Sequence, residues 1–443
     1  MPERPVAKVI NLVPDQDQAI AGMSLAAARG LLLEDDPAAT LRIQGSFALV
    51  AQQGSTVRLA RSLDRPLRYF LAKQAEGPLL VVADRIDAIF RCLAERRLAD
   101  QFHPSYTRMV PAHHVTEVQL VGCPDPNPCH RRFFDPPRGV LPADFDVIGE
   151  VYVQALCAEI RLWLAAVPRQ EPLGVLFSGG ADSGAVLLCT YHELLAAGQS
   201  PARLKAFTLA VDGGGGDLAQ ARELLAQTGL AILGEEIEAG SAELDPFQAV
   251  AVIEDYKPLD VEAATMELAL LRGLRRRYPS WRLLVDGDGG DENFKDYPIE
   301  ENPELTIRSV VGNRMLYQEG WGVDAVKQSL TYSGGLSRGS VRGYAPARRH
   351  GFSLFSPNTR PRVVAAAEAI PFAELAQGSH QALYRIKGEV LSRGIRRVTG
   401  LSMPVFGKRR FQHGAAAPAV SRDLFGVPAW RYRRHLLELY ETV

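Results

Sequence analysis

The sequence predicts an α/β protein with a β-rich N-terminal part and a larger part built on a doubly wound parallel sheet. Short apolar runs separated by turn residues fill the chain up to about residue 135. From residue 173 onward, apolar runs alternate with stretches of helical periodicity. Between them lies a Pro-Pro-x-Gly segment at 136–139, where we place a linker. The predicted domains are therefore residues 1–138 and 139–443.

In the N-terminal part, three strands and one helix are expected. The strands are the apolar runs at 41–50, 56–61 and 77–83, and the first two are separated by a Gln-Gly-Ser turn at 53–55. A helix should begin after Asp84, which is placed to act as its N-cap. Such short, closely spaced strands indicate sheets rather than a helical bundle.

In the C-terminal part, a helix over 147–167 should lead into alternating strands and helices. We expect strands at 173–177, 204–211 and 281–285, helices at 183–197, 217–228 and 261–277, and an apolar run at 230–233. Residues 300–443 appear mostly helical, with loops around 331–361 and 400–418. Because ligands of parallel sheets bind at the carboxyl ends of the strands, the functional residues should follow these strands.

The segment Ser178–Ser183, with the sequence Ser-Gly-Gly-Ala-Asp-Ser, follows the first of these strands and precedes a helix. Such a loop offers backbone N–H groups and the positive end of a helix dipole to a phosphate. Gly179 and Gly180 allow close approach, the two serines add hydroxyl donors, and Asp182 can hold Mg²⁺. The spacing is not that of a Walker loop. An ordinary Gly-rich turn is the alternative.

A second polar segment, Asp286–Glu292, follows the strand at 281–285 and carries four acidic residues among three glycines. Burying so many carboxylates requires cations or donors. Asp291 could join Asp182 on Mg²⁺, and Asp288 could act as a base. Taken alone, the segment could equally be a calcium-type loop or an acidic turn. Lys408 lies in a basic loop and could neutralise a leaving group or an oxyanion, although such loops are usually solvated surface.

Composition points to a soluble cytoplasmic protein. Lys and Arg total 50 against 51 Asp and Glu, so charge gives no argument for a nucleic-acid or membrane partner. We find no apolar run of transmembrane length and no signal-type N-terminus. Five cysteines are few for 443 residues and suit a reducing compartment.

In this order, the motifs resemble the asparagine synthetase / β-lactam synthetase family over nearly the whole chain. Residues 178–183 match its pyrophosphate loop, 286–292 its second motif, and 408–414 the segment with its catalytic lysine, while residues 44–48 and 60–67 are similar to its glutaminase domain. The resemblance implies an Ntn-type αββα sandwich followed by an ATP-pyrophosphatase domain. It implies the catalytic residues Asp288 and Lys408, the metal ligands Asp182 and Asp291, and ATP contacts from Leu176, Ser178, Gly179, Gly180, Asp182, Ser183, Leu209 and Gly287.

The chain departs from the family pattern at four positions. Pro2 stands where glutamine-hydrolysing members have Cys, so we expect no glutaminase activity in this chain. Asp288 replaces Glu or Tyr, and Glu262 aligns with an arginine of asparagine synthetases. Lys295 is a candidate for the positive charge that Glu262 does not supply.

The resemblance implies an enzyme that uses ATP and Mg²⁺ to adenylate a carboxylate, releasing pyrophosphate, and then transfers the acyl group to an amine or ammonia. The amine could also belong to the same substrate molecule, in which case the reaction closes a ring. The substrates would be small molecules, and the protein could form a homodimer. Sulfur insertion by the same type of ATP site, or a catalytically degenerate ATP-binding scaffold, are the alternatives.

Overall fold

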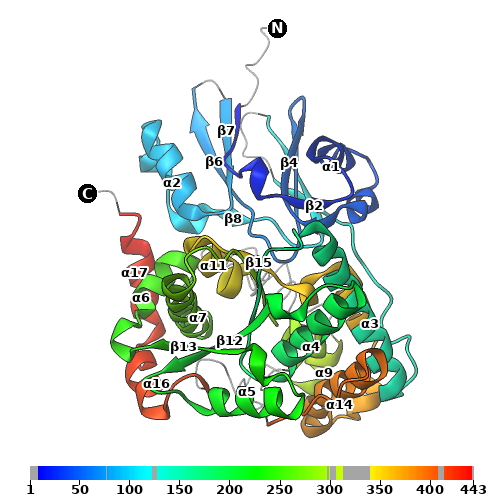
Figure 1. Cartoon of the computed structure of the whole chain (residues 1–443). Helices are drawn as coiled ribbons and strands as arrows, with labels where there is room; N and C mark the ends of the chain where they lie inside the picture. Colours follow the sequence, from blue (N-terminus) through cyan, green and yellow to red (C-terminus); the bar gives the residue numbers. More distant parts are fainter. Residues whose placement is uncertain are drawn as a thin grey trace.

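A computed structural model of the chain describes residues 8–75, 77–121, 127–296, 299, 306–312, 340–407 and 414–441. The N-terminal part, blue to cyan in Figure 1, lies above the larger part that contains the parallel sheet. Two four-stranded sheets face each other in the N-terminal part. Their strands, in spatial order, are β1 (Lys8–Asn11), β7 (Gly77–Ala83), β6 (Arg68–Gln74) and β8 (Arg108–Met109), and β10 (Cys129–Arg132), β9 (His114–Gln119), β5 (Thr56–Arg61) and β4 (Ala48–Gln53).

Alternation of side chains along the strands builds this sandwich. In β7, Leu80 and Val82 pack between the sheets, while Leu79 and Val81 face helix α2 (Ile86–Glu95). Helix α1 (Leu25–Leu32) covers the other sheet. The order of layers is therefore helix, sheet, sheet, helix, as expected for strands with period-two patterning on both faces. The small elements here are η1 (Asp15–Asp17), β2 (Ala19–Ala21), η2 (Pro37–Arg42), β3 (Gln44–Ser46), η3 (Ala99–Gln101) and η4 (Pro104–Tyr106).

The expected single strand over 41–50 is wrong. A 3₁₀ turn ends at Arg42, β3 pairs with β2, and β4 begins only at Ala48. Gly45 explains the break, because its φ of 121° brings it so close to β2 that a Cβ would lie 2.0 Å from a backbone oxygen of that strand. The strands at 56–61 and 77–83 are confirmed.

The C-terminal part contains a five-stranded, all-parallel sheet. Its order is β13 (Gly234–Ala239), β12 (Leu204–Val211), β11 (Leu173–Leu176), β14 (Leu283–Val285) and β15 (Ser353–Phe355). Along the chain, β12 and β13 are added on one side of β11, and β14 and β15 are then added on the other side. Such a reversal of strand order leaves a crevice at the carboxyl ends of β11 and β14, where open α/β sheets bind their ligands.

Helices cover both faces of this sheet. One face packs against α3 (Phe145–Ala166), α4 (Ala181–Ala196), α5 (Gly216–Gln227) and α14 (His380–Thr399), and the other against α7 (Pro258–Arg277) and α11 (Ala345–Arg349). The remaining helices are η5 (Pro201–Arg203), η6 (Ala231–Leu233), η7 (Ser241–Glu243), α6 (Pro246–Ile253), α8 (Gly290–Phe294), α9 (Ile307–Gly312), η9 (Ser340–Tyr344), η10 (Pro357–Thr359), α12 (Pro361–Glu368), α13 (Phe372–Ala376), α16 (Pro418–Phe425) and α17 (Ala429–Glu438). The described helices include none that is both long enough and apolar enough to cross a bilayer.

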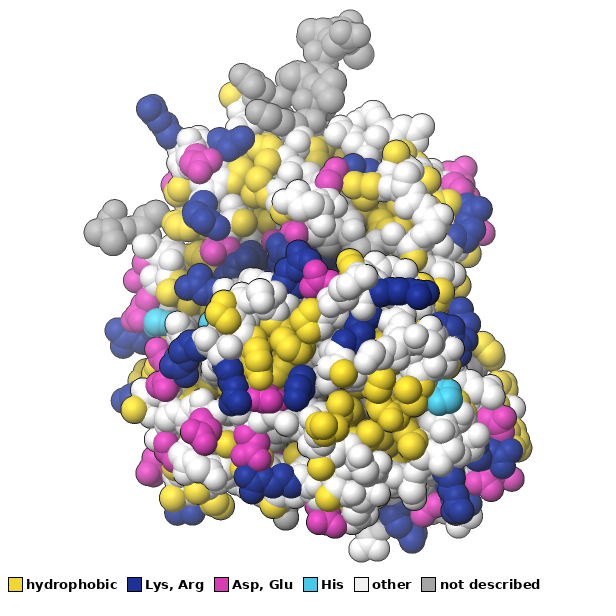
Figure 2. Space-filling model, viewed as in Figure 1, with side chains coloured by type: hydrophobic (Ala, Val, Ile, Leu, Met, Phe, Trp, Pro, Cys, Tyr) yellow, Lys and Arg dark blue, Asp and Glu magenta, His cyan; other side chains and the backbone are white. Residues whose placement is uncertain are grey.

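Buried charges join the N-terminal part to the parallel-sheet part. Arg360, just before α12, donates to Asp64 at 3.0 Å, and their side chains are 4% and 8% exposed. Glu254, after α6, accepts from the backbone N–H groups of Ile86 and Asp87 at 2.7 and 2.9 Å. It thereby caps α2, a role that the sequence had suggested for Asp84. Figure 2 shows Lys and Arg side chains gathered along this junction on one face.

Candidate active site

The phosphate-loop candidate lies where the fold predicts, directly after β11. Gly180 is the N-cap of α4, and Ser178 and Ser183 face each other across the turn with their hydroxyl oxygens 3.3 Å apart. The backbone N–H of Gly180 donates to the Ser178 hydroxyl at 3.3 Å. Gly179 has a φ of 75°, and a Cβ there would lie 2.5 Å from the backbone N of Ala221 in α5. Only glycine fits this position, so the loop sits tightly against the next helix.

The acidic segment meets this loop through backbone contact. A Cβ on Gly287 would lie 2.8 Å from the backbone N of Ser183, and one on Gly290 would lie 2.3 Å from Asp182 Oδ1. Gly289 has a φ of 93° and turns the chain into α8, which carries Asp291 in its first turn. The two motifs that are about 100 residues apart in the sequence therefore form one continuous wall of the crevice.

A buried hydrogen-bond network supports the acidic segment from behind. The Tyr152 hydroxyl donates to Asn358 Oδ1 and accepts from the amide of Asn293, both at 3.0 Å. The Asn358 amide then donates to the carbonyl of Gly287 at 3.0 Å. Burial raises the pKa of Tyr152, so its hydroxyl stays protonated. The network holds the turn at 286–290 in a fixed position relative to α3.

Asp286 and Asp288 form an electrostatically strained pair. Their Oδ2 atoms are buried and have no hydrogen-bond partner in the part of the chain that the structure describes. They would lie 2.9 and 3.3 Å from a Cβ on Gly343. Burial, together with repulsion from Asp288, raises the pKa of Asp286 well above its ordinary value. Burial raises the pKa of Asp288 to about 6; Arg342 opposes the rise, while Glu292 and Asp291 add to it. A carboxyl with such a pKa is suited to accept a proton near neutral pH.

Two further residues of this wall were not predicted from the sequence. Glu267 on α7 has its pKa raised by burial and by the carboxylates of Asp288 and Asp286. Arg342 donates to Glu292 at 3.0 Å and is the cation that lowers the pKa of Asp288. Among the described groups, carboxylates therefore outnumber cations in this region, which favours a positively charged or proton-donating ligand there.

Lys387 is the unexpected central residue of the site. Its Nζ donates to Asp182 Oδ2 at 2.8 Å and to Asp291 Oδ1 at 2.5 Å, and it forms an ion pair with Asp296 Oδ2 at 2.7 Å. The side chain of Lys387 is 9% exposed. Burial alone would lower the pKa of Lys387, but the three carboxylates outweigh it and hold the pKa well above its ordinary value. Burial raises the pKa of Asp182 to about 7 despite the attraction of Lys387.

The structure thus brings Asp182 and Asp291 together, as the sequence had predicted for two magnesium ligands. Asp182 Oδ1 is buried and has no hydrogen-bond partner among the described residues, so this oxygen could contact a cation. Within the described part of the chain, no three Asp, Glu, His or Cys side chains are arranged as a complete metal site. A magnesium ion here would fit the usual pattern of one or two carboxylates, with phosphate and water oxygens as the remaining ligands.

The predicted catalytic Lys408 lies outside the described residues, but both flanks of its segment are placed. Val405 packs on α14, where a Cβ on Gly388, next to Lys387, would lie 3.0 Å from it. After the segment, the carbonyl of Ala415 accepts from the N–H of Val211 at the end of β12, at 3.1 Å. The described residues before the segment therefore lie beside the helix of Lys387, and those after it lie at the carboxyl edge of the sheet.

The other sequence-based expectations have mixed outcomes. Leu176 and Leu209 are buried in one apolar cluster on the α7 face of the sheet. Lys295 does not supply a charge to the crevice, because it is buried against Glu368, with Nζ 3.5 Å from its carboxylate. Cys189 is fully buried, and burial and neighbouring Cys157 raise its thiol pKa, which disfavours the thiolate that sulfur chemistry requires. Pro2 lies outside the described residues.

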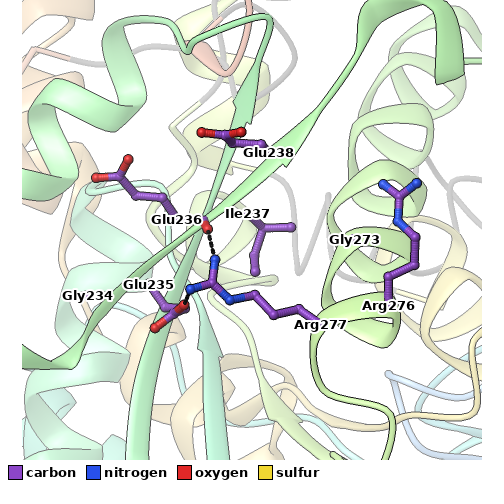
Figure 3. A pocket seen from close by; sticks show the side chains of 8 residues that line it. All are labelled: Gly234, Glu235, Glu236, Ile237, Glu238, Gly273, Arg276 and Arg277. Atoms are coloured by element: carbon purple, nitrogen blue, oxygen red, sulfur yellow. Dashed lines mark hydrogen bonds and ion pairs between the residues drawn. The ribbon is translucent and has the colours of Figure 1, made fainter.

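A separate hollow of about 730 Å³ lies along the edge strand β13, and Figure 3 shows its lining. Arg277 reaches across it to the carboxylate of Glu235 and donates to the backbone carbonyl of Glu236 at 3.2 Å. Of the other lining charges, Glu236 pairs with Arg222 and Arg276 pairs with Glu243. It does not include the loops after β11 and β14, where the candidate catalytic groups converge.

Comparison with known proteins agrees with this geometry. A model of the asparagine synthase family matches residues 165–382, which include the phosphate loop, the acidic segment and α7. No curated protein shows a significant match to the chain. The family match supports an ATP-dependent synthetase function of the amidation type. Residues 165–382 therefore form a domain of the asparagine synthase family.

Proposed function

We propose that the protein is an AMP-forming carbon–nitrogen ligase. In the first step, an oxygen of the substrate carboxylate attacks the α-phosphorus of ATP and pyrophosphate leaves. In the second step, an amine or ammonia attacks the acyl carbon of the adenylate and AMP leaves. Carboxylates are poor acyl donors, and adenylation makes their carbon electrophilic.

The observation that carries this proposal is the backbone contact between the two loops in the crevice. The Ser-Gly-Gly-Ala-Asp-Ser turn after β11 and the Asp-Gly-Asp-Gly-Gly-Asp turn after β14 meet at Gly287 and Ser183. One turn provides N–H and hydroxyl donors at a helix N-terminus, and the other provides carboxylates. Donors for phosphate and ligands for its counter-ion thus lie side by side.

In the adenylation step, the backbone of Gly179 and Gly180 and the hydroxyls of Ser178 and Ser183 would hold the departing pyrophosphate. Lys387 lies beside this loop through its bond to Asp182 and would compensate the charge of the phosphates. Asp182 and Asp291 are the residues that would hold Mg²⁺, which screens the phosphate charge when it is bound. Leu176 and Leu209 would border the nucleotide, and the backbone of Gly287 would close the crevice around it.

In the amide-forming step, Asp288 would accept a proton from the attacking nitrogen. Its pKa, raised to about 6, leaves the carboxylate ionised at neutral pH and basic enough to take the proton. Lys408 would stabilise the oxyanion of the tetrahedral intermediate. The amine can belong to a second molecule or to the same substrate, in which case the reaction closes a ring.

The test is ATP–pyrophosphate exchange with a panel of small carboxylic acids, followed by addition of amines or ammonium and mass analysis of the products. We expect exchange that depends on the acid and on Mg²⁺, and an amide that appears only after the nitrogen donor is added. Formation of ADP and phosphate in place of AMP and pyrophosphate would contradict the proposal. Exchange lost in Asp182→Asn but retained in Asp288→Asn would assign the two carboxylates to different steps.

A further inference from the structure

Lys387 occupies an unusual position for a buried lysine. Its ammonium has three carboxylates around it: it donates to Asp182 and Asp291 at 2.8 and 2.5 Å, and it forms an ion pair with Asp296 at 2.7 Å. The three partners come from the first turn of α4, the first turn of α8 and the residue that follows Lys295. Carboxylate oxygens from separate elements thus surround one point, as they would around a metal ion, but the cation at this point is the ammonium of Lys387.

Two of these three partners, Asp182 and Asp291, are the residues proposed to hold Mg²⁺. A metal ion on Asp182 and Asp291 would lie close to the ammonium of Lys387 even if it used the other carboxylate oxygens, and the repulsion between two such cations at about 4 Å amounts to several kcal/mol in a partly buried site. The carboxylates around the ammonium hold it in place as long as no other cation or acceptor competes for these contacts. The phosphates of a nucleotide offer the ammonium an alternative set of acceptors.

We propose that Lys387 is a resident counter-ion that keeps the metal position filled until nucleotide arrives, so that loading of Mg²⁺ depends on nucleotide. Without nucleotide, the ammonium satisfies Asp182, Asp291 and Asp296. With nucleotide, the ammonium turns to the phosphates and releases Asp182 and Asp291 to the metal. The inference rests on the proposed ATP site. Its test uses metal binding and thermal stability, which are independent of whether an amide is ever formed.

The test compares metal binding by nucleotide-free wild-type protein and by Lys387→Met. Removal of the ammonium leaves the three carboxylates without their cation, so we expect the variant to have a lower Tm and to bind Mn²⁺ at least tenfold more tightly than wild type by electron paramagnetic resonance. Millimolar Mg²⁺ should raise the Tm of Lys387→Met by several degrees and leave that of nucleotide-free wild type unchanged. Wild type should bind Mn²⁺ tightly only when a non-hydrolysable ATP analogue is present.

Lys295→Met is the matched control. Lys295 is also a buried lysine with a carboxylate partner, and that partner, Glu368, is not one of the three carboxylates around Lys387. This variant should also lose stability, and Mg²⁺ should not restore it. Adding Asp182→Asn to Lys387→Met should abolish the gain in Mn²⁺ affinity, because one of the freed carboxylates is then neutral.

Several results would overturn the inference. Tight Mn²⁺ binding by nucleotide-free wild type would show that the lysine does not fill the metal position, and this comparison holds even if Lys387→Met does not fold. Unchanged Mn²⁺ affinity in a folded Lys387→Met would show that Lys387 forms ion pairs of structural importance only and does not compete with the metal. If metal binding behaves as expected but no carboxylic acid supports pyrophosphate exchange, the counter-ion role stands and the proposed reaction fails.

Discussion

Substitution of Gly287 by alanine is the most direct perturbation of the contact between the two loops. The added Cβ would lie 2.8 Å from the backbone N of Ser183 and 3.0 Å from the carbonyl carbon of Asp182. Ordinary contacts begin near 3.4 Å, so the loops must separate by about 0.6 Å, and backbone atoms on both sides cannot rotate away. Overpacking of this kind destabilises by about 1–3 kcal/mol, which lowers Tm by about 1–3 °C in a chain of this size.

The effect on adenylation should be larger than the effect on stability. Misplacement of a reacting group by about 1 Å can reduce a rate by about 10²-fold. We therefore expect ATP–pyrophosphate exchange in Gly287→Ala to fall by roughly ten- to a hundredfold at a temperature well below its Tm. Gly30→Ala is the control, since Gly30 lies in α1 with no atom within 4 Å of the added carbon. Wild-type exchange and Tm in Gly287→Ala would refute the close contact of the two loops.

Four other predictions test the charges of the site and of the junction. If Asp288 is the proposed base, with a pKa of about 6, kcat/KM for the amine should fall as the pH decreases below 6. Asp288→Asn should lose this pH dependence and about 10²–10³-fold in rate. A wild-type pH profile in the variant would remove Asp288 from the reaction. The folded-state pKa of Asp288 lies above its ordinary value of 3.8, so its ionisation weakens the fold as the pH rises through about 6, and Asp288→Asn should exceed wild type in Tm at pH 8 but not below pH 4. Asp64→Asn and Arg360→Met should each lower the free energy of unfolding by about 3–5 kcal/mol, and the double variant should lose clearly less than the sum of the two. Additive losses in denaturant titrations would argue against the buried pair. Glu254→Gln should speed hydrogen exchange at the amides of Ile86 and Asp87, and unchanged protection would show that α2 does not depend on this cap.

The location of the site could be predicted from sequence patterns because it follows from local signals and one general rule of parallel sheets. The strands before Ser178 and Asp286 are apolar runs with glycine-rich ends, and the carboxyl ends of neighbouring parallel strands share one edge. That rule brings Asp182 and Asp291 together, as the structure confirms. It gives no information on which side chain from outside these loops would join them.

Lys387 was missed because its partners are distant in the sequence; it lies 205 residues from Asp182 and 96 from Asp291. One local signal could have indicated it. On α14, the buried face contains Leu383, Ile386, Val390 and Leu391, and Lys387 falls on that same face. A charged residue at an apolar position of an amphipathic helix must have a buried partner, which the sequence alone does not identify.

The short strands could not be predicted for a different reason. β15 has only three residues, Ser353–Phe355, and too few positions to show alternation. It forms because its backbone pairs with β14 along Leu283–Val285. Likewise, the break after Arg42 depends on the close approach of Gly45 to β2, which is a tertiary contact. Elements that exist through pairing rather than through their own pattern leave little trace in one sequence.

The proposed reaction is tested most directly by following the oxygen of the substrate carboxylate. A carboxylic acid that supports pyrophosphate exchange is labelled with ¹⁸O in both carboxyl oxygens, and the reaction is run to completion with ATP, Mg²⁺ and the nitrogen donor. If the carboxylate attacks the α-phosphorus, one labelled oxygen must appear in AMP, and its mass rises by two while pyrophosphate stays unlabelled. AMP without label, or label in inorganic phosphate formed together with ADP, would contradict adenylation and with it the account of the site.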